Sequence, residues 1–410
     1  MGKLKNIFFK IRYYLLLLLI NLLLFIFTAR FHLALIMEGY PGTISDPSGD
    51  AWYYYYMSIS PFNPNIAAPF CYRILTPLII YLLPINSITG YWIFTVICTV
   101  LTSFILFHFL KKLGFNNIYS YCGSMLFIIS IANFFLFYFT IFVDPLLYLL
   151  FTLGCLIILY IDLEKIKGLK EVFLISLILT LGIMNKENII LLIPMYAMIT
   201  KGHKGYKFVK TIVVSIPPII TFILLRRFIP SSAVSFEQLC IIFHLENWPK
   251  SLFAIIITFS LLWFPSLINI YRGKINAKYN RFLKYSTLMI PVFALQIALA
   301  TDIYRNVFLG FPIIIPAALG IVFSIEKSIF KFNNEGHKHD SNLPGSNLLL
   351  WIILFFQASI AILYFLQWEL VVNLYLEFMR PYYFGVIFIG ILFSLYLSIK
   401  YFFLNKQNSL

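Results

Sequence analysis

Residues 118–161 read IYSYCGSMLFIISIANFFLFYFTIFVDPLLYLLFTLGCLIILYI, and Asp144 is the only charged residue among them. A helix needs about 20 mostly apolar residues to cross the hydrocarbon core of a bilayer. The stretch therefore predicts two successive spanning helices, over 118–141 and 145–161, with Asp144 between them. Because similar stretches recur along the chain, the sequence predicts an all-α polytopic membrane protein.

The composition of the whole chain agrees with this prediction. Of the 410 residues, 61% are hydrophobic and 11% are charged. Soluble domains contain about 45–50% apolar and about 25% charged residues, so lipid must be the solvent for much of this surface. The five cysteines lack CxxC spacing, which disfavours a disulfide framework or a zinc site. The formal charge of +15 comes from basic residues scattered between apolar stretches, which disfavours a nucleic-acid partner.

Apolar stretches of membrane length predict about ten full spanning helices and one short broken hairpin. The hairpin covers 172–200, where Asn-Lys-Glu-Asn at 185–188 leaves two arms that are each too short to span. The long first outer loop, about 37–89, contains a short Pro-bounded segment over 74–83 that we expect to be an interfacial helix. The predicted spans are roughly 13–36, 90–110, 118–141, 145–161, 209–225, 251–271, 284–300, 306–325, 347–366 and 383–403.

These stretches divide the chain into three parts. Residues 1–325 form a transmembrane module, 326–346 a polar cytoplasmic linker, and 347–410 a C-terminal two-helix hairpin. His337 and His339 lie in the linker, where a solvated His-x-His is favoured over a metal site.

The distribution of charge predicts the orientation of the chain. With both termini on the cytoplasmic side, the cytoplasmic segments hold 23 of the 31 Lys and Arg residues, whereas 10 of the 16 acidic residues lie outside. An excess of Lys and Arg in cytoplasmic segments is the pattern of membrane proteins in general. The bias toward Phe, Ile, Lys and Asn is typical of an AT-rich genome, which favours a bacterial cytoplasmic membrane.

Several charged residues fall near the predicted outer face. A charge within a spanning helix is costly unless it faces a cavity or a partner, so these residues are functional candidates. Arginine binds phosphate through two parallel hydrogen bonds, and a carboxylate can act as a general base toward a hydroxyl. Together they predict an outward-facing polar cleft suited to group transfer from a lipid-phosphate donor. The candidates are Asp46, Asp50, Arg73, Asp144, Lys186, Glu187, Asp302 and Arg305.

Five motifs in this order resemble the GT-C superfamily of integral-membrane glycosyltransferases, which use polyprenyl- or dolichyl-phosphate sugars. The resemblance covers about residues 13–325. The motifs are DPSGDAWYYYY at 46–56, PFCYRILTP at 69–77, FVDPLL at 142–147, LGIMNKENIILLIP at 181–194, and DIYR at 302–305 followed by Pro312.

The resemblance implies an inverting transfer from a polyprenyl-phosphate-linked sugar to a glycan, lipid or protein acceptor outside the cytoplasm. Asp50 is the implied catalytic base, with Asp46 as the second choice. The resemblance assigns no metal ligand, and a divalent cation is compatible with the sequence but not required by it. Many relatives carry a soluble C-terminal domain that this sequence does not show, which leaves the acceptor site unassigned. As donor-phosphate ligands we predict Arg305, Lys186 and Arg73, with Asp144, Glu187, Asp302, Trp52 and Tyr53 as supporting residues.

Structural interpretations compete with these roles. Asp50 and Asp144 are also suited to begin helices, and Asp46 to form a turn. The Lys186–Glu187 pair would equally stabilise the broken hairpin. For Arg305 the phosphate role is favoured, and a contact with Asp302 is the structural alternative. Anchoring at headgroups is an alternative for Arg73, is favoured for Arg226 and Arg227, and is favoured for most of the Trp52–Tyr56 run. For the whole protein, the alternatives are a transporter or flippase of a polar lipid or glycan, and a polysaccharide polymerase or ligase.

Overall fold

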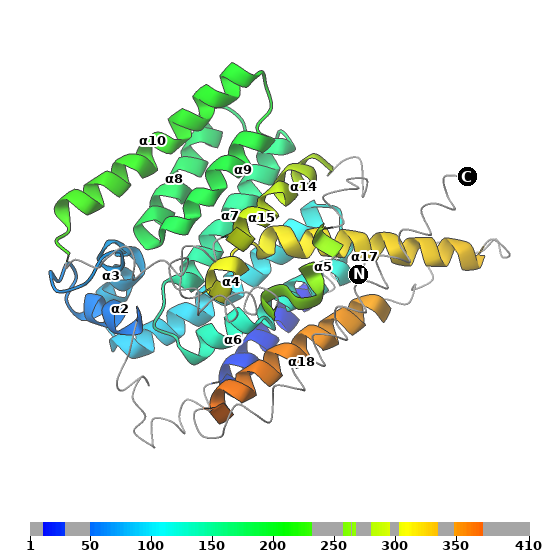
Figure 1. Ribbon diagram of the computed structural model, residues 1–410, viewed down its shortest axis with the longest axis horizontal. Coiled ribbons are helices and arrows are strands. Elements are labelled where there is room, and N and C mark those ends of the chain that lie inside the picture. The colour runs from blue at the N-terminus through cyan, green and yellow to red at the C-terminus, as the bar shows by residue number, and fades with distance from the viewer. Residues whose placement is uncertain are drawn as a thin grey trace, which may run out of the picture.

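The computed structural model describes residues 11–28, 50–231, 257–263, 265–267, 280–295, 303–334 and 348–371. Within these ranges every regular element is a helix (Figure 1), so the predicted all-α class is confirmed there. Most of the predicted span 251–271 and all of 383–403 lie outside the described residues, as do Asp46, Asp302, His337 and His339.

Four described helices are long and apolar enough to cross a membrane. Each overlaps a predicted span. A fifth crossing is added if the bent pair formed by α5 (Asn117–Ile128) and α6 (Ile131–Tyr138) counts as one span, so the predicted total of about ten is not confirmed. The four are Ile11–Thr28, α4 (Ser87–Lys112), α7 (Asp144–Asp162) and α10 (Lys204–Phe228).

The predicted span 118–141 is not one straight helix. It consists of α5 (Asn117–Ile128) and α6 (Ile131–Tyr138), which are bent by 49°. The Ser130 hydroxyl accepts a hydrogen bond from the Asn133 amide nitrogen and caps α6, while the Asn133 side chain donates to the Phe127 carbonyl at 2.6 Å. Because side chains satisfy backbone groups on both sides of the bend, the helix can break inside an apolar run.

The predicted broken hairpin is present. Its arms are α8 (Leu169–Asn185) and the pair η2 (Glu187–Leu191) and α9 (Leu192–Ile199). Lys186 between them is extended, with φ −165° and ψ 135°. A Cβ atom on Gly182 would collide with Ile189, so only glycine lets the last turn of α8 approach η2 this closely.

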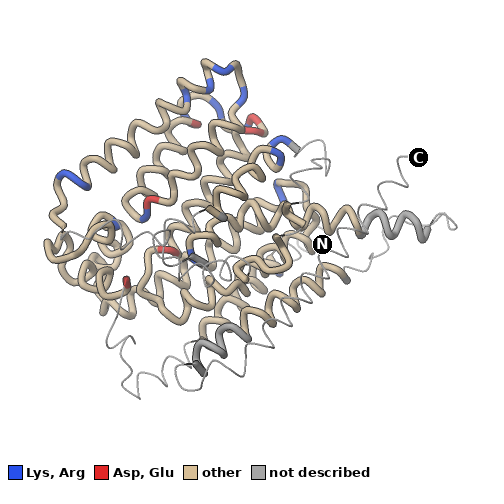
Figure 2. The backbone as a smooth tube through the Cα atoms, viewed as in Figure 1, with Lys and Arg blue, Asp and Glu red and all other residues tan. Residues whose placement is uncertain are grey.

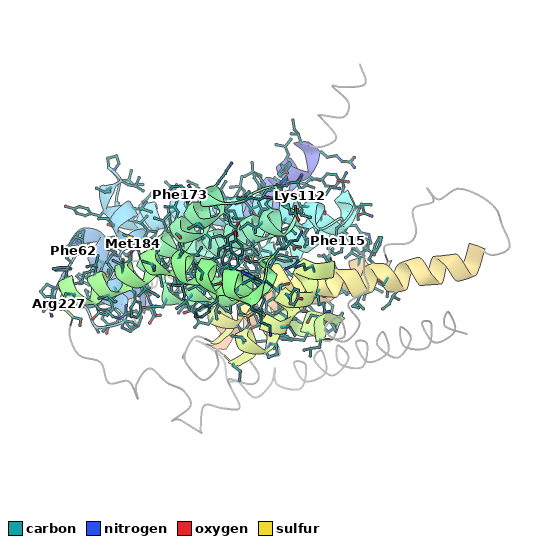
Figure 3. All side chains as sticks on the ribbon, turned by 90° about the horizontal axis from the view of Figure 1, so that it is seen from above. Phe62, Lys112, Phe115, Phe173, Met184 and Arg227 are labelled. Atoms are coloured by element: carbon teal, nitrogen blue, oxygen red, sulfur yellow. The ribbon has the colours of Figure 1, made fainter. Side chains whose placement is uncertain are left out.

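Three short helices lie together beyond one end of the long ones. They are α2 (Asp50–Ile59), η1 (Phe70–Tyr72) and α3 (Leu75–Leu82), and α3 falls within the predicted segment 74–83. Figure 3 shows Phe62, from the loop after α2, near Arg227 at the end of α10, whereas Lys112 at the end of α4 lies far from both.

The later helices pack against the first half of the chain. The helix α17 (Phe311–Asn334) extends through the first part of the segment predicted as a linker, and α18 (Leu348–Val371) packs against α5 and α6. The elements are η5 (Ser260–Leu262), α14 (Asn280–Ser286), η6 (Thr287–Met289), α15 (Ile290–Leu295), α16 (Ile303–Phe308), α17 (Phe311–Asn334) and α18 (Leu348–Val371).

Charged residues gather at two separate ends of the fold (Figure 2). We call the end where α8 and α10 begin the basic end, since lysines 165, 167, 170, 201, 204, 207 and 210 lie there. At this end Glu171 accepts hydrogen bonds from Lys210 at 2.6 Å and from the Tyr196 hydroxyl at 2.7 Å, and Glu164 pairs with Lys201 at 2.8 Å. Those predicted functional charges that the structure describes lie at the other end.

Candidate functional site

Asp50 begins α2, where its carboxylate reaches a residue far along the chain. Arg305 Nη2 lies 3.1 Å from Asp50 Oδ2. The side chain of Asp50 is 27% exposed, whereas that of Arg305 is only 2% exposed. Asp50 is therefore a carboxylate held on its buried side and accessible on the other, as a base that meets a substrate must be.

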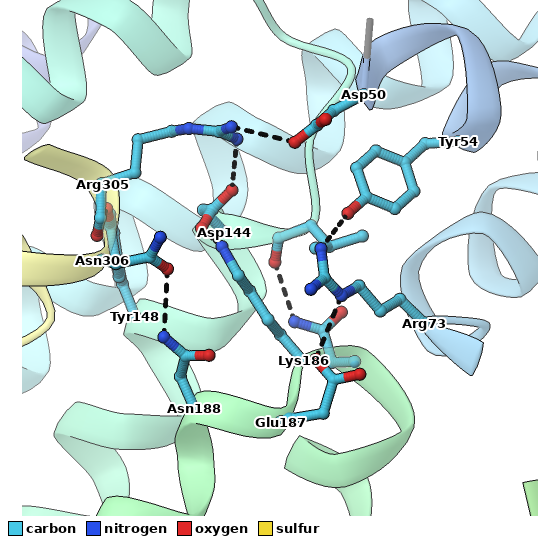
Figure 4. Close-up of polar contacts among 12 residues, drawn as sticks. Asp50, Tyr54, Arg73, Asp144, Tyr148, Lys186, Glu187, Asn188, Arg305 and Asn306 are labelled. Carbon is cyan, nitrogen blue, oxygen red and sulfur yellow. Dashed lines mark hydrogen bonds and ion pairs between the residues drawn. The ribbon is translucent and has the colours of Figure 1, made fainter. Parts of the chain in front are cut away.

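Arg305 comes from α16 and is fixed by several groups. Its Nη1 donates to Asp144 Oδ2 at 2.8 Å, and its guanidinium lies over the Phe142 ring, 4.0 Å from the centroid. The Tyr148 hydroxyl donates to its backbone carbonyl at 2.8 Å. One guanidinium thus joins two carboxylates, from α2 and from α7 (Figure 4).

Asp144 lies at the start of α7 and also binds Lys186, whose Nζ is 2.7 Å from Asp144 Oδ1. Both side chains are almost fully buried. Lys186 reaches Asp144 because the break between α8 and η2 places its extended backbone beside the first turn of α7. Asn185 secures that break, since its side chain donates to the Val143 carbonyl at 2.8 Å and accepts from the Thr76 hydroxyl at 2.6 Å.

Arg73 follows η1 and belongs to a second group of contacts in the same region (Figure 4). Its Nε lies 3.1 Å from Glu187 Oε2, and its Nη1 donates to the Tyr54 hydroxyl at 2.9 Å. Tyr54 stands one turn after Asp50 on α2, and the Tyr91 hydroxyl donates to its carbonyl at 2.9 Å. Arg73 therefore helps to hold the helix that carries Asp50.

The charges in this second group stabilise one another. Burial alone would lower the pKa of Arg73, but the neighbouring Glu187 carboxylate and Tyr54 hydroxyl raise it above its ordinary value. Burial alone would raise the pKa of Glu187, but Arg73 and then Arg226 hold it below its ordinary value. Both groups are therefore charged at neutral pH.

Of the two predicted aromatic residues, Tyr53 packs against a neighbouring ring and Trp52 is partly exposed. Tyr53 stacks on Phe70 with ring centroids 4.7 Å apart, so it fixes η1 against α2. Trp52 is partly exposed and contacts Tyr56 at 4.4 Å between centroids. Of the run Trp52–Tyr56, only Trp52 and Tyr56 are exposed.

Six predicted site residues thus come together from five separate segments. They are Asp50, Arg73, Asp144, Lys186, Glu187 and Arg305. The two groups they form are joined by neighbouring residues in the chain, since Lys186 belongs to one group and Glu187 to the other.

Sequence reasoning missed four residues that hold the site: Tyr54, Tyr148, Asn185 and Arg226. Tyr54 had a detectable signal, because residues four apart share a helix face and Tyr54 is four residues after Asp50. Arg226 was assigned to anchoring, yet it lies 3.6 Å from Glu187. The roles of Tyr148 and Asn185 depend on partners 157 and 42 residues away.

Among the described residues, no group of three or more His, Cys, Asp or Glu side chains is arranged to hold a metal ion. The site residues described above provide a partly exposed carboxylate, several cations and aromatic rings. Cations of this kind neutralise a developing phosphate charge, and the carboxylate can accept a proton.

No protein-family model matches the chain, and a comparison with curated proteins finds no relative.

Proposed function

We propose that the protein is a membrane glycosyltransferase that transfers a sugar from a polyprenyl-phosphate donor to an acceptor hydroxyl on the non-cytoplasmic face. The observation that supports this most is the connection of Asp50, partly exposed, to the buried cations through Arg305. A base and a phosphate-neutralising charge are thereby available within one network.

In the proposed reaction, Asp50 accepts the proton of the acceptor hydroxyl as its oxygen attacks the anomeric carbon. The bond from that carbon to the phosphate oxygen breaks, and the lipid phosphate leaves with the electron pair. A single displacement of this kind inverts the anomeric configuration. The nearby cations balance the negative charge of the leaving phosphate.

The roles of the cations follow from how deeply each is buried. Both terminal nitrogens of Arg305 already bind carboxylates, so Arg305 positions Asp50. Lys186 is buried against Asp144 and contributes positive charge without a direct contact to solvent. Arg73 is less buried than either, so we assign to it the direct contact with the incoming phosphate.

The membrane orientation belongs to the same proposal. The basic end is cytoplasmic under the positive-inside rule, so the site faces the outer side of a bacterial cytoplasmic membrane. The separation of the two charged ends along α10 supports this, because Lys204 begins that helix and Arg226 and Arg227 end it.

The test is transfer of a radiolabelled sugar from a polyprenyl-phosphate donor in membranes that contain Asp50→Asn. We expect a loss of about 100-fold or more, typical of removing a general base. Glu164→Gln, at the basic end, is the matched control and should leave transfer unchanged. Full activity of a well-folded Asp50→Asn variant would remove Asp50 from the reaction.

A transporter or flippase of a polar lipid or glycan is the second candidate. The break between α8 and η2, with Lys186 and Asp144 buried beside it, favours this class because transporters often bind substrates at interrupted helices. Proteoliposomes distinguish the two: movement of labelled lipid without sugar transfer indicates a transporter. A polymerase or ligase would instead require carrier-linked acceptor as well as carrier-linked donor.

A further inference from the structure

Two arginines from different elements converge on the carboxylate of Glu187. Arg73 Nε lies 3.1 Å from Oε2, and Arg226 Nη2 lies 3.6 Å from Oε1. Each carboxylate oxygen therefore faces a different guanidinium. Two guanidinium groups that face one anion from two sides are also the arrangement that binds a phosphate group.

Aromatic rings hold both guanidinium groups in place. The Arg226 guanidinium carbon lies 3.4 Å from the ring centroid of Phe222 and 4.6 Å from that of Tyr72. The Arg73 guanidinium carbon lies 5.2 Å from the ring centroid of Phe70. Stacking on rings restricts the rotation of the side chains, so the nitrogens are oriented before an anion arrives.

The Glu187 carboxylate can separate from its arginine partners more easily than the buried Asp144 carboxylate can. Its side chain is 25% exposed and that of Arg226 is 32% exposed, whereas Asp144 is 1% exposed. A displaced Glu187 carboxylate can turn toward solvent, so displacement does not bury an unpaired charge. Moving Asp144 away from Arg305 would leave a buried charge uncompensated.

We propose that Arg73 and Arg226 form a phosphate-binding site that Glu187 occupies in this structure, and that an incoming phosphate binds by displacing the Glu187 carboxylate. The phosphate is an anion as the carboxylate is, so the two arginines keep a negative counter-charge after the exchange. The identification of this phosphate with that of the sugar donor rests on the proposed function. The binding site itself does not.

The test is equilibrium binding of a long-chain polyprenyl monophosphate to the purified full-length protein in nanodiscs. Inorganic phosphate and the uncharged polyprenol are the companion probes. If inorganic phosphate competes with the lipid phosphate, the site recognises the phosphate group itself. If it does not compete, the site recognises the phosphate as a lipid headgroup. Equal binding of the polyprenol would overturn the proposal, because the charge would then contribute nothing.

Glu187→Gln is the decisive variant. Glutamine keeps the shape of glutamate but does not compete as an anion, so we expect the lipid phosphate to bind about tenfold more tightly, as removal of one charge-assisted contact predicts. Arg226→Gln should bind it about tenfold more weakly for the same reason. Arg227→Gln removes the same charge from the adjacent exposed residue and should leave binding unchanged.

The proposal fails if Glu187→Gln binds no more tightly than the unsubstituted protein, or if Arg226→Gln and Arg227→Gln behave alike. If Glu187→Gln does not fold, the comparison of the two arginine variants decides alone. Sugar transfer is measured separately: binding that follows the expected order in a protein without transferase activity supports the phosphate site and rejects the glycosyltransferase. Transfer that requires Asp50 but does not respond to Glu187→Gln or Arg226→Gln rejects only the phosphate site.

Discussion

Arg305 Nη1 lies 2.8 Å from Asp144 Oδ2, although 161 residues separate the two in the chain. Both side chains are almost fully buried. The pair joins α16 to α7 and leaves Nη2 of the same guanidinium directed at Asp50. Asp144 thereby determines where Arg305 can hold the proposed base.

The Asp144 carboxylate should be essential for stability, because it compensates both Arg305 and Lys186. Asp144→Asn leaves two buried cations without a formal counter-charge there. We expect the free energy of unfolding to fall by about 3–5 kcal/mol, measured by denaturation in detergent. Glu164→Gln removes a carboxylate from a surface ion pair at the basic end, and an equal loss in that variant would contradict the role of burial.

The Arg305→Lys variant tests whether the positive charge of Arg305 is sufficient or the planar geometry of its guanidinium is required. Lysine keeps the positive charge but lacks the planar fork that contacts Asp50 and Asp144 together. We expect sugar transfer to fall about tenfold or more, because the proposed base is no longer oriented, while the variant still folds. Transfer equal to that of the unsubstituted protein would show that Arg305 acts only through its charge.

Gly182→Ala should disturb the hairpin break, since the new Cβ would collide with Ile189. We expect a loss of about 1–3 kcal/mol in the free energy of unfolding, typical of overpacking. Gly205→Ala in α10 is the matched control, because a Cβ atom at that position would meet no atom within 4 Å. A loss in the control as large as in Gly182→Ala would refute the packing explanation.

The stability contributed by Glu187 should depend on pH. Its pKa in the folded protein lies below the ordinary value of 4.5, so its contribution is fully present above that value. The contribution is lost as the pH falls through the lowered pKa. Thermal unfolding between neutral and acidic pH should therefore show a weaker acid dependence in Glu187→Gln than in the unsubstituted protein. Identical dependence in both would exclude this contribution.

The two ends of the fold should be accessible from opposite sides of the membrane. Phe62→Cys should react with an impermeant maleimide added to intact cells, and Lys201→Cys only after permeabilisation. Both positions are exposed, whereas the four described cysteines are buried and provide a low background. Cys240, outside the described residues, should be replaced by serine. The reverse pattern would invert the proposed orientation.

Much of the local structure could be predicted from the sequence. The helices α4, α7 and α10 fall on predicted apolar stretches, and the chain breaks at Lys186 as expected. Local features account for these successes, since helix length, apolar character and interrupting charges are properties of neighbouring residues. The bend between α5 and α6 was missed because it depends on hydrogen bonds of Ser130 and Asn133 that hydropathy does not register.

The sequence by itself determined which segments are apolar helices and which charges are unusual enough to need a partner. Only the tertiary structure decided what those partners are: Arg305 holds Asp50 and Asp144, and Arg226 meets Glu187. The physical reason is that the cost of burying a charge is a property of the residue and is visible in the sequence. The compensation comes from residues that folding brings together from other parts of the chain, 161 positions apart in the case of Arg305 and Asp144.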